Sequence, residues 1–283
     1  MRNASTATAS KSNAPHRIVS EEEWLKARQE LLAKEKKLMR EHDALAAERR
    51  ALPWVKVEKN YLFDTPGGQK TLGELFEGRS QLLVYHLMFA PDWEAACLGC
   101  SYVSDHFDGA VWHLANRDVT LVAVSRAPLA KFAPFKQRMG WRFKWYSSFG
   151  SDFNRDFHVA FTREEMTRGK MFYNYKFQSY PMEEGHGLSA FYQDALGNVF
   201  HTYSTYGRGV ETFINTYNLL DLAPKGRDEQ DQKPMPMAWV RHHDKYESDY
   251  FRDEPARGAA DAAKSPASAR QAGSAARDCC HKP

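Results

Sequence analysis

The sequence predicts an α/β fold in which a mixed sheet is flanked by helices. Two apolar segments of strand length, 81–89 and 118–125, enclose a helical pattern, which is typical of a βαβ unit with parallel strands. Further along, the segments 188–193 and 199–204 flank a turn and predict an antiparallel hairpin. A last helical pattern, 210–217, follows the hairpin. Strand, helix, strand, helix, hairpin and helix is the order of an α/β domain.

The composition is that of an ordinary soluble protein. The chain has 283 residues, of which 42% are hydrophobic and 27% are charged, and its net charge is only +3. This balance predicts neither nucleic acid nor an anionic membrane as a partner. There is no run of ~18 apolar residues, so no membrane span is predicted. The first fifteen residues lack the apolar stretch of a secretory signal, and we therefore expect a cytoplasmic protein.

The N-terminal part is predicted to contain a disordered leader, 1–18, and a long helix, 19–52. Ser20 and Glu23 have the spacing of a capping box, which marks the start of the helix. Such a helix either lies along the body of its own domain or pairs two subunits as a short coiled coil, and the second alternative predicts a homodimer. The apolar residues that suggest this recur every seven positions, at Trp24, Leu31, Leu38, Leu45 and Leu52.

Residues 53–250 are predicted to form the folded domain. The segment 55–63 alternates like a strand, and Pro128 opens a helix over 128–139. The segment 162–187 reads as an insertion before the hairpin. Beyond the domain, Ala, Ser, Arg, Asp and Gly dominate, which predicts a disordered tail over 251–283. Aromatic residues alternate within the insertion as in an edge strand, or as in a lid, at Tyr173, Tyr175 and Phe177.

The cysteines carry the chemistry that the sequence suggests. Cys97 and Cys100 have C-x-x-C spacing and lie between the first buried strand and a helical pattern, at the edge where α/β sheets bind ligands. The free amides of a helix N-terminus lower the pKa of a thiol. Cys97 is therefore the predicted nucleophile. Cys100 follows it by about one helical turn, and is the predicted resolving cysteine.

Other interpretations of the cysteines remain. Cys97 and Cys100 could simply be buried structural residues, because free cysteine is often buried. A structural zinc site needs four ligands, and Cys279, Cys280 and His281 could supply the others only if the tail folded back. Nothing in the tail sequence suggests such a fold, and we expect neither a metal nor another cofactor. The two tail cysteines are interpreted as idle.

Several longer segments resemble one family. From His16 to Tyr246 the chain is similar to the bacterial DUF899 family, a thioredoxin-like group described as predicted dithiol-disulfide oxidoreductases. The resemblance implies a thioredoxin-like fold and a dithiol centre at Cys97 and Cys100, and it implies little about the substrate. The matching segments are 85–93, 97–101, 105–109, 117–128, 138–141, 147–154, 206–209, 224–229 and 237–241.

Two departures from wider thioredoxin patterns stand out. The hairpin is entered by His186 and Gly187, where thioredoxins place a cis-proline, and Ala96 replaces the tryptophan that precedes their first cysteine. Peroxiredoxins, which are related in fold, carry Thr-x-x-Cys, whereas Glu94 stands three residues before Cys97 here. This difference disfavours a peroxidase.

The resulting hypothesis is a thiol-disulfide oxidoreductase that acts on an unidentified thiol or disulfide partner. The alternatives are a peroxiredoxin-like thiol peroxidase and a non-catalytic redox-sensing or interaction scaffold. Asp92 and Trp93 are expected to shape the pocket before Cys97, although Trp93 could also only cover the sheet edge. Arg126 and Arg208 are expected near the substrate, with a solvated arginine and a helix cap as their plainer roles. His86 is interpreted as a hydrogen-bonded core histidine.

Overall fold

The structure is a computed structural model that describes residues 16–233 and 235–247. The predicted tail lies outside the described residues, as does the predicted leader apart from residues 16–18, which form no regular element. The chain divides into one compact unit that ends at Tyr246 and a second that begins at Glu247, the only described residue of the latter. All elements given below belong to the first unit.

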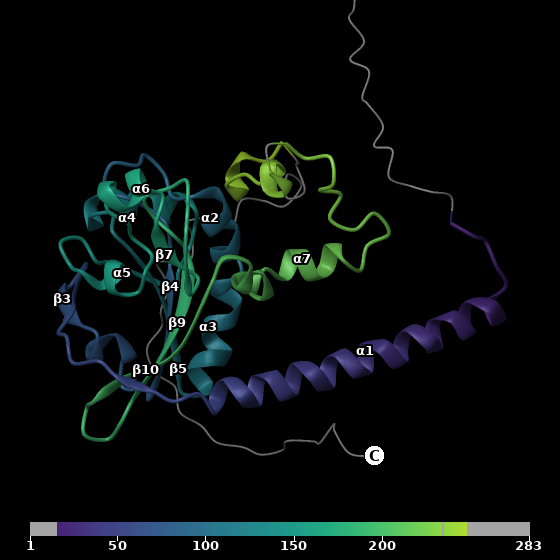
Figure 1. Cartoon of the computed structure of the whole chain (residues 1–283), viewed down its shortest axis with the longest axis horizontal. Coiled ribbons are helices and arrows are strands. Elements are labelled where there is room, and N and C mark those ends of the chain that lie inside the picture. Colours follow the sequence, from purple (N-terminus) through teal and green to yellow (C-terminus); the bar gives the residue numbers. More distant parts are fainter. Residues whose placement is uncertain (1–15, 234, 248–283) are drawn as a thin grey trace, which may run out of the picture. The chain divides into compact units, whose positions relative to one another are not determined.

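The core of this unit is an eight-stranded mixed sheet (Figure 1). Strand β4 pairs with β5 in parallel and with β9 antiparallel, and β9 continues into the hairpin with β10. The predicted βαβ unit and hairpin are therefore confirmed, and the domain has the predicted mixed sheet flanked by helices. In sheet order, the strands are β1 (Val55–Lys56), β10 (Val199–Tyr206), β9 (Gly187–Gln193), β4 (Gln81–His86), β5 (Val119–Ser125), β6 (Lys144–Ser147), β2 (Leu62–Thr65) and β3 (Gly68–Thr71).

Short helices connect and flank these strands. Figure 1 shows α2 and α3 following one another along one side of the sheet. Between β4 and β5 the helical pattern is split in two, because the chain turns at Asp105 and His106. The helices after the first are η1 (Gly73–Phe76), α2 (Leu98–Ser104), α3 (Phe107–Asn116), α4 (Leu129–Arg138), α5 (Phe153–Asp156), α6 (Arg163–Arg168), η2 (Gly207–Phe213), α7 (Asn215–Leu220), η3 (Pro236–Trp239) and η4 (His243–Lys245).

Alternate side chains of the central strands enter two different hydrophobic cores. Tyr85 of β4 and Ala123 of β5 belong to a core that includes residues of α2, α3 and α4. Val84 and Val122, one position away, belong to a second core with residues of η1 and α5. Burial on both faces explains why these strands are continuously apolar in sequence. His86 is fully buried and its Nε2 lies 2.8 Å from Ser189 Oγ, as expected for a hydrogen-bonded core histidine.

The segment 55–63, predicted as one strand, contains parts of two strands that lie in opposite halves of the strand order. Val55 and Lys56 form β1 beside β10, whereas β2 starts at Leu62 and pairs with β6 and β3. Residues 57–61 carry the chain from one half of the sheet to the other. The alternation of polar and apolar residues does not reveal this crossing, because the same alternation runs through both short strands and the residues that link them.

The N-terminal helix α1 spans Glu21–Arg50 and begins with the predicted capping box: Glu23 N donates to Ser20 Oγ at 3.2 Å. None of its residues is buried. No helix within residues 16–233 or 235–247 has the length and apolar character needed to cross a bilayer.

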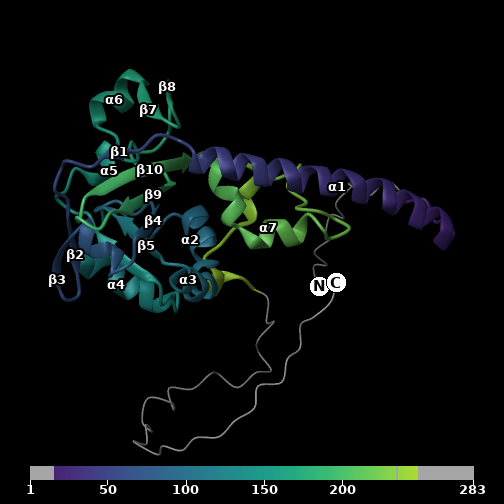
Figure 2. The ribbon, with the colours of Figure 1, turned by 90° about the horizontal axis from the view of Figure 1, so that it is seen from below.

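The insertion forms a small layer of its own. Figure 2 shows α6 together with strands β7 (Met171–Tyr173) and β8 (Lys176–Gln178), which pair only with each other. Asn174 and Tyr175 adopt left-handed backbone conformations, with φ of 51° and 63°, and turn the chain between the two strands. The predicted single edge strand is therefore a hairpin, because an extended strand cannot contain two such residues in its middle.

Candidate active site

Cys97 is held by the backbone at the point where β4 has ended and α2 begins. Its amide donates to Met88 O at 3.0 Å, and its carbonyl oxygen accepts from Ser101 N and Ser101 Oγ, both at 2.9 Å. Cys97 is thus the residue that caps α2, and Cys100 lies within the first turn of that helix. Both are free thiols; Cys97 is partly exposed and Cys100 is 2% exposed.

The two thiols have opposite tendencies to ionise. A hydrogen bond from the Cys100 thiol, and the amides of Cys100 and Gly99, lower the pKa of Cys97 to about 6 against the opposing effect of burial. Burial raises the pKa of Cys100 well above its ordinary value, and the neighbouring Cys97 adds to this effect. The pair can therefore hold one thiolate at Cys97 and one proton at Cys100 near neutral pH.

Two tyrosines have pKa values that this pair helps to raise. Tyr85 of β4 is fully buried, its hydroxyl has no partner of standard hydrogen-bond geometry, and burial followed by the influence of Cys100 raises its pKa. Burial raises the pKa of Tyr180 to about 12, and both thiols add to that shift. The Tyr173 and Tyr180 rings lie 4.8 Å apart. The sequence suggested Tyr173, Tyr175 and Phe177 as an aromatic lid and did not identify Tyr85 or Tyr180.

The segment 235–247 also reaches the dithiol loop. His242 Nε2 donates to Ala96 O at 3.0 Å, and its Nδ1 accepts from Arg138 Nη2 at 2.9 Å. A Cβ placed on Gly99 would stand 3.5 Å from the Met237 methyl carbon and 3.9 Å from Cys97 Sγ, so Met237 lies over the turn between the cysteines. No local sequence signal points to these contacts, because 104 positions separate Arg138 from His242 and 146 separate Ala96 from His242.

The four residues expected in the pocket occupy different environments. Asp92 is exposed, and Trp93 is half-buried against the core that contains Cys100. Arg126 is bound to two carboxylates of the insertion, with its Nε 2.6 Å from Glu184 Oε1 and its Nη2 3.4 Å from Glu183 Oε2. Arg126 is thus held by this ion pair, and its expected place near the substrate stays a prediction.

Arg208 also lies in an ion pair. Its side chain is 87% exposed, and its guanidinium binds Glu211 at 2.8 Å and 3.1 Å within the same short helix, η2. Both roles predicted for Arg208, near the substrate and as a cap of the last helix, stay predictions. Neither arginine is among the groups that lower the pKa of Cys97; the Cys100 thiol and two amides take that role.

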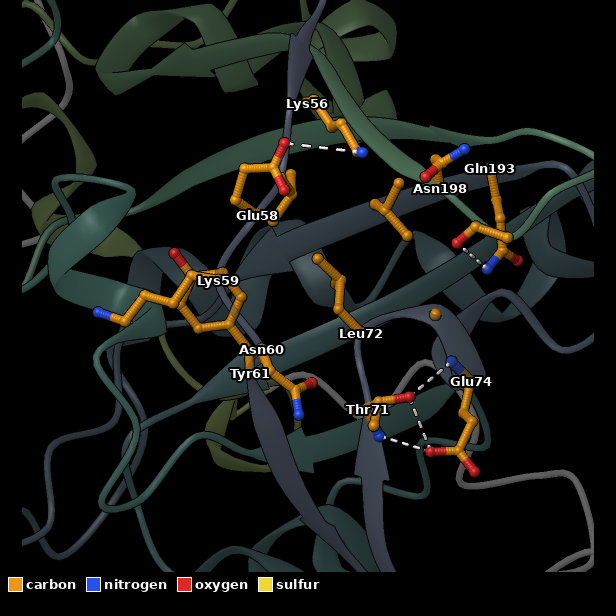
Figure 3. A pocket seen from close by; sticks show the side chains of 14 residues that line it. Lys56, Glu58, Lys59, Asn60, Tyr61, Thr71, Leu72, Glu74, Gln193 and Asn198 are labelled. Atoms are coloured by element: carbon orange, nitrogen blue, oxygen red, sulfur yellow. Dashed lines mark hydrogen bonds and ion pairs between the residues drawn. The ribbon is translucent and has the colours of Figure 1, made fainter.

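A separate cavity lies at the other end of the sheet. It measures about 590 Å³ and is bounded by the link between β1 and β2, by η1 and by the turn of the β9–β10 hairpin. In Figure 3, Thr71 and Glu74 bond to each other on one wall, and Lys56 and Glu58 form an ion pair on another. Gln193, which also lines the cavity, follows Tyr192, and Tyr192 pairs with Gln81, the first residue of β4. Because Cys97 follows the opposite end of β4, this cavity is not part of the dithiol site.

The described residues contain no group of three or more His, Cys, Asp or Glu side chains arranged to hold a metal ion. Cys279, Cys280 and His281 lie outside the described residues, and the zinc alternative therefore stays a hypothesis for the tail.

Comparisons with known proteins add a family and distant structural likenesses. The family described as "Bacterial protein of unknown function (DUF899)" matches residues 13–246. No curated protein shows a significant match.

Three solved structures illustrate the structural likeness. Peroxiredoxin Q of Xanthomonas campestris is 13% identical over 59% of this chain and 96% of its own, with a TM-score of 0.38. PrxQ of Xylella fastidiosa is 12% identical over 59% and 94%, with a TM-score of 0.37. Peroxidoxin BcpB of Mycobacterium tuberculosis is 15% identical over 58% and 95%, with a TM-score of 0.34. At such identities and TM-scores, the activities of these proteins do not carry over to this chain.

Proposed function

The chain belongs to the DUF899 family, and from the arrangement of Cys97 and Cys100 we propose that it is a thiol-disulfide oxidoreductase. The observation that carries the proposal is the contrast between the two thiols. Cys97 is partly exposed with a pKa lowered to about 6, whereas the pKa of the buried Cys100 is raised. An attacking thiol needs to be accessible and ionised, and a resolving thiol needs to stay protonated until it is used.

The proposed reaction has two exchange steps. The Cys97 thiolate attacks one sulfur of a substrate disulfide, a mixed disulfide forms, and the first substrate thiolate leaves and takes up a proton. Cys100 then loses its proton and attacks the Cys97 sulfur, which releases the second substrate thiol and leaves a Cys97–Cys100 disulfide. The substrate gains two electrons and the protein loses two. A thiol reductant restores the pair by the reverse exchange.

Mass analysis tests this proposal. Because the chain has only two other cysteines, Cys279→Ser/Cys280→Ser leaves the dithiol as its sole redox pair. In that background, a disulfide oxidant should remove two alkylatable thiols together, and a dithiol reductant should restore both. Cys97→Ser should abolish reductant-driven reduction of disulfides. If Cys97→Ser turns over disulfides as fast as its parent, the proposal is wrong.

Two further arms separate the alternatives. Oxidation by a hydroperoxide that is faster than oxidation of a free thiol would indicate a thiol peroxidase. Formation of the Cys97–Cys100 disulfide without turnover would instead indicate a redox-sensing scaffold. A reduced dithiol at rest suits a reducing compartment, so we propose a cytoplasmic location, which fractionation of the native host would test.

A further inference from the structure

A further cavity lies on the face of the sheet that is turned away from the dithiol. It measures about 460 Å³ and is bounded by the link between β1 and β2, the end of α5, the β7–β8 hairpin and β10. It shares the β1–β2 link with the cavity in Figure 3. Phe157 lines it and belongs to the core of Val84 and Val122, whereas Cys100 belongs to the core on the other face. A cavity of this volume can hold a small molecule.

Aromatic rings make up more than half of the residues that line this cavity. The Phe157 ring meets the His201 ring edge to face, with 5.2 Å between the ring centroids. The Tyr175 and Tyr206 rings lie 5.6 Å apart. Tyr206 is buried and Tyr175 is 63% exposed, so this pair extends from the interior to the surface. Such walls bind a flat apolar group by burying its surface.

The charged groups at the cavity compensate one another. Lys59 Nζ lies 2.8 Å from Asp156 Oδ2 and 2.8 Å from Asp152 Oδ2. Lys56 and Glu58 form a second, longer ion pair at 3.7 Å. The charged side chains that line the cavity are two lysines, one aspartate and one glutamate, so their formal charges cancel. An uncharged ligand therefore suits this cavity better than an ion does.

His201 presents a hydrogen-bond acceptor to this cavity. Its Nε2 lies 3.1 Å from Tyr203 O and 2.7 Å from Ser204 Oγ. A carbonyl oxygen only accepts, so Nε2 carries the ring proton and Nδ1 carries a lone pair. Among the residues that the structure describes, Nδ1 has no hydrogen-bond partner, and it is not one of their buried unpartnered atoms. It is therefore an accessible acceptor.

A buried chain of hydrogen bonds holds the His201 ring in this position. Ser204 Oγ lies 2.8 Å from Ser189 Oγ, and Ser189 Oγ lies 2.8 Å from His86 Nε2. These three side chains are at most 3% exposed. Burial also lowers the pKa of His201, which keeps its ring neutral and its Nδ1 unprotonated at neutral pH. The acceptor is thus fixed in place before a ligand binds, which reduces the entropy lost on binding.

We propose that this cavity binds an uncharged aromatic molecule with an O–H or N–H donor, and that His201 Nδ1 accepts the hydrogen bond from that donor. The inference goes beyond the proposed function, because it concerns the opposite face of the sheet and needs neither Cys97 nor Cys100. The aromatic walls supply affinity, and the positioned acceptor supplies selectivity. An analogue without a donor would cover Nδ1 and leave it unpaired, which weakens binding.

Two naphthalenes that differ in one group test the proposal. At neutral pH, 2-naphthol is uncharged and carries an O–H donor, whereas the oxygen of 2-methoxynaphthalene only accepts. Fluorescence titration of the full chain with each probe gives the two dissociation constants. We expect 2-naphthol to bind about tenfold more tightly. In protein with ¹⁵N-labelled histidine, the Nδ1 resonance of His201 should shift with 2-naphthol and not with 2-methoxynaphthalene.

Two variants locate the site. His201→Phe keeps an aromatic ring and removes the acceptor, so it should weaken 2-naphthol binding about tenfold and leave 2-methoxynaphthalene binding within about twofold. His113→Phe is the matched control: it makes the same change at an exposed residue of α3, a helix that packs on the other core. We expect it to leave both dissociation constants unchanged. The resonance measurement uses wild type, so the test holds even if His201→Phe does not fold.

The outcomes decide for or against this site. A preference for 2-naphthol that is lost in His201→Phe and kept in His113→Phe supports the proposal. Equal dissociation constants for the two probes in wild type, or no saturation by either below about 1 mM, would overturn it. So would a His201 Nδ1 resonance that 2-naphthol does not move. If His113→Phe weakens 2-naphthol binding as much as His201→Phe does, the probe binds elsewhere and the role of His201 is refuted.

Discussion

The Arg126 guanidinium binds the carboxylate of Glu184 at 2.6 Å, and Glu184 is 1% exposed. The two residues lie 58 positions apart, one after β5 and the other in the insertion. This pair joins the insertion to the edge of the sheet where the dithiol lies. Burial nevertheless outweighs the attraction of Arg126 and raises the pKa of Glu184 to about 7.

The raised pKa of Glu184 predicts a specific pH dependence of stability. A carboxyl whose pKa is higher in the folded state stabilises the fold below its unfolded pKa of roughly 4.3, and this contribution is lost as pH rises through about 7. Glu184→Gln mimics the protonated side chain at every pH. We expect the stability of wild type relative to Glu184→Gln to fall by roughly 3 kcal/mol between pH 5 and pH 8.

Urea unfolding of both proteins at the two pH values measures this difference. Glu183→Gln, at the more exposed partner of Arg126, is the control and should show little pH dependence. A constant difference between wild type and Glu184→Gln would contradict the assignment.

The Cys100 thiol is expected to control the reactivity of Cys97. It provides the largest contribution to the lowered pKa of Cys97. In the background without tail cysteines, Cys100→Ala should raise the pKa of Cys97 toward its ordinary value and slow alkylation at pH 7 by about tenfold or more. Cys100→Ser keeps a hydrogen-bond donor and should retain most of the reactivity. The rate of reaction with iodoacetamide between pH 4 and pH 10 gives the pKa of Cys97 in each variant. Equal pH profiles for Cys100→Ala and Cys100→Ser would refute this explanation.

The sequence predicts the centre of this fold better than its periphery. The strands β4 and β5 are continuously apolar because both faces are buried, and a glycine-containing turn marks the β9–β10 hairpin, so each has a strong local signal. In contrast, β1 has two residues and β2 has four, and the residues that join them alternate in polarity as the strands do. Contacts with β10 and β6, which are far away in sequence, decide where β1 and β2 join the sheet.

The candidate site shows the same division. The position of Cys97 and Cys100 follows from local order, since the motif lies between a buried strand and a helix. The role of Arg126 depends on which side chains it contacts. No local sequence pattern indicates that Glu184 of the insertion is buried. Met237 reaches the dithiol turn only through tertiary folding, and its sequence neighbourhood does not distinguish it from an ordinary core residue.

Gly187 is expected to be essential for the junction between β4, β9 and β10. It pairs with His86 on one side and Tyr206 on the other, and a Cβ there would overlap the Tyr206 ring and stand 2.8 Å from Thr205 O. Gly187→Ala should therefore destabilise the fold by about 2–4 kcal/mol, because backbone cannot yield as a flexible side chain can.

A second glycine provides the control for this prediction. Gly109 lies inside α3 with open space around its Cβ position, so Gly109→Ala should stabilise by roughly 0.5–1 kcal/mol through helix propensity. Thermal and urea unfolding measure both changes. Equal effects of the two substitutions would show that the close approach at Gly187 is relieved without cost.

Helix α1 leads to a prediction about assembly. It has 30 residues, none of them buried, and the large apolar side chains along it remain 38–64% exposed. An isolated helix gains most of its stability from packing an apolar face, and this stripe repeats every seven residues, which is the period of a coiled coil. We therefore propose that a second copy of the chain covers the stripe and forms a homodimer.

Sedimentation of the full chain tests this assembly. Wild type should sediment as a dimer at micromolar concentration, and Leu31→Glu/Leu38→Glu should be monomeric, because it places charges in the seam. Glu30→Ala/Lys37→Ala, also in α1 but on the far side of the helix from the stripe, should remain dimeric. A monomeric wild type, or a dimer that survives Leu31→Glu/Leu38→Glu, would rule out α1 as the interface. Since α1 and the dithiol are separate elements, the same monomeric variant should keep the Cys97 alkylation rate of wild type.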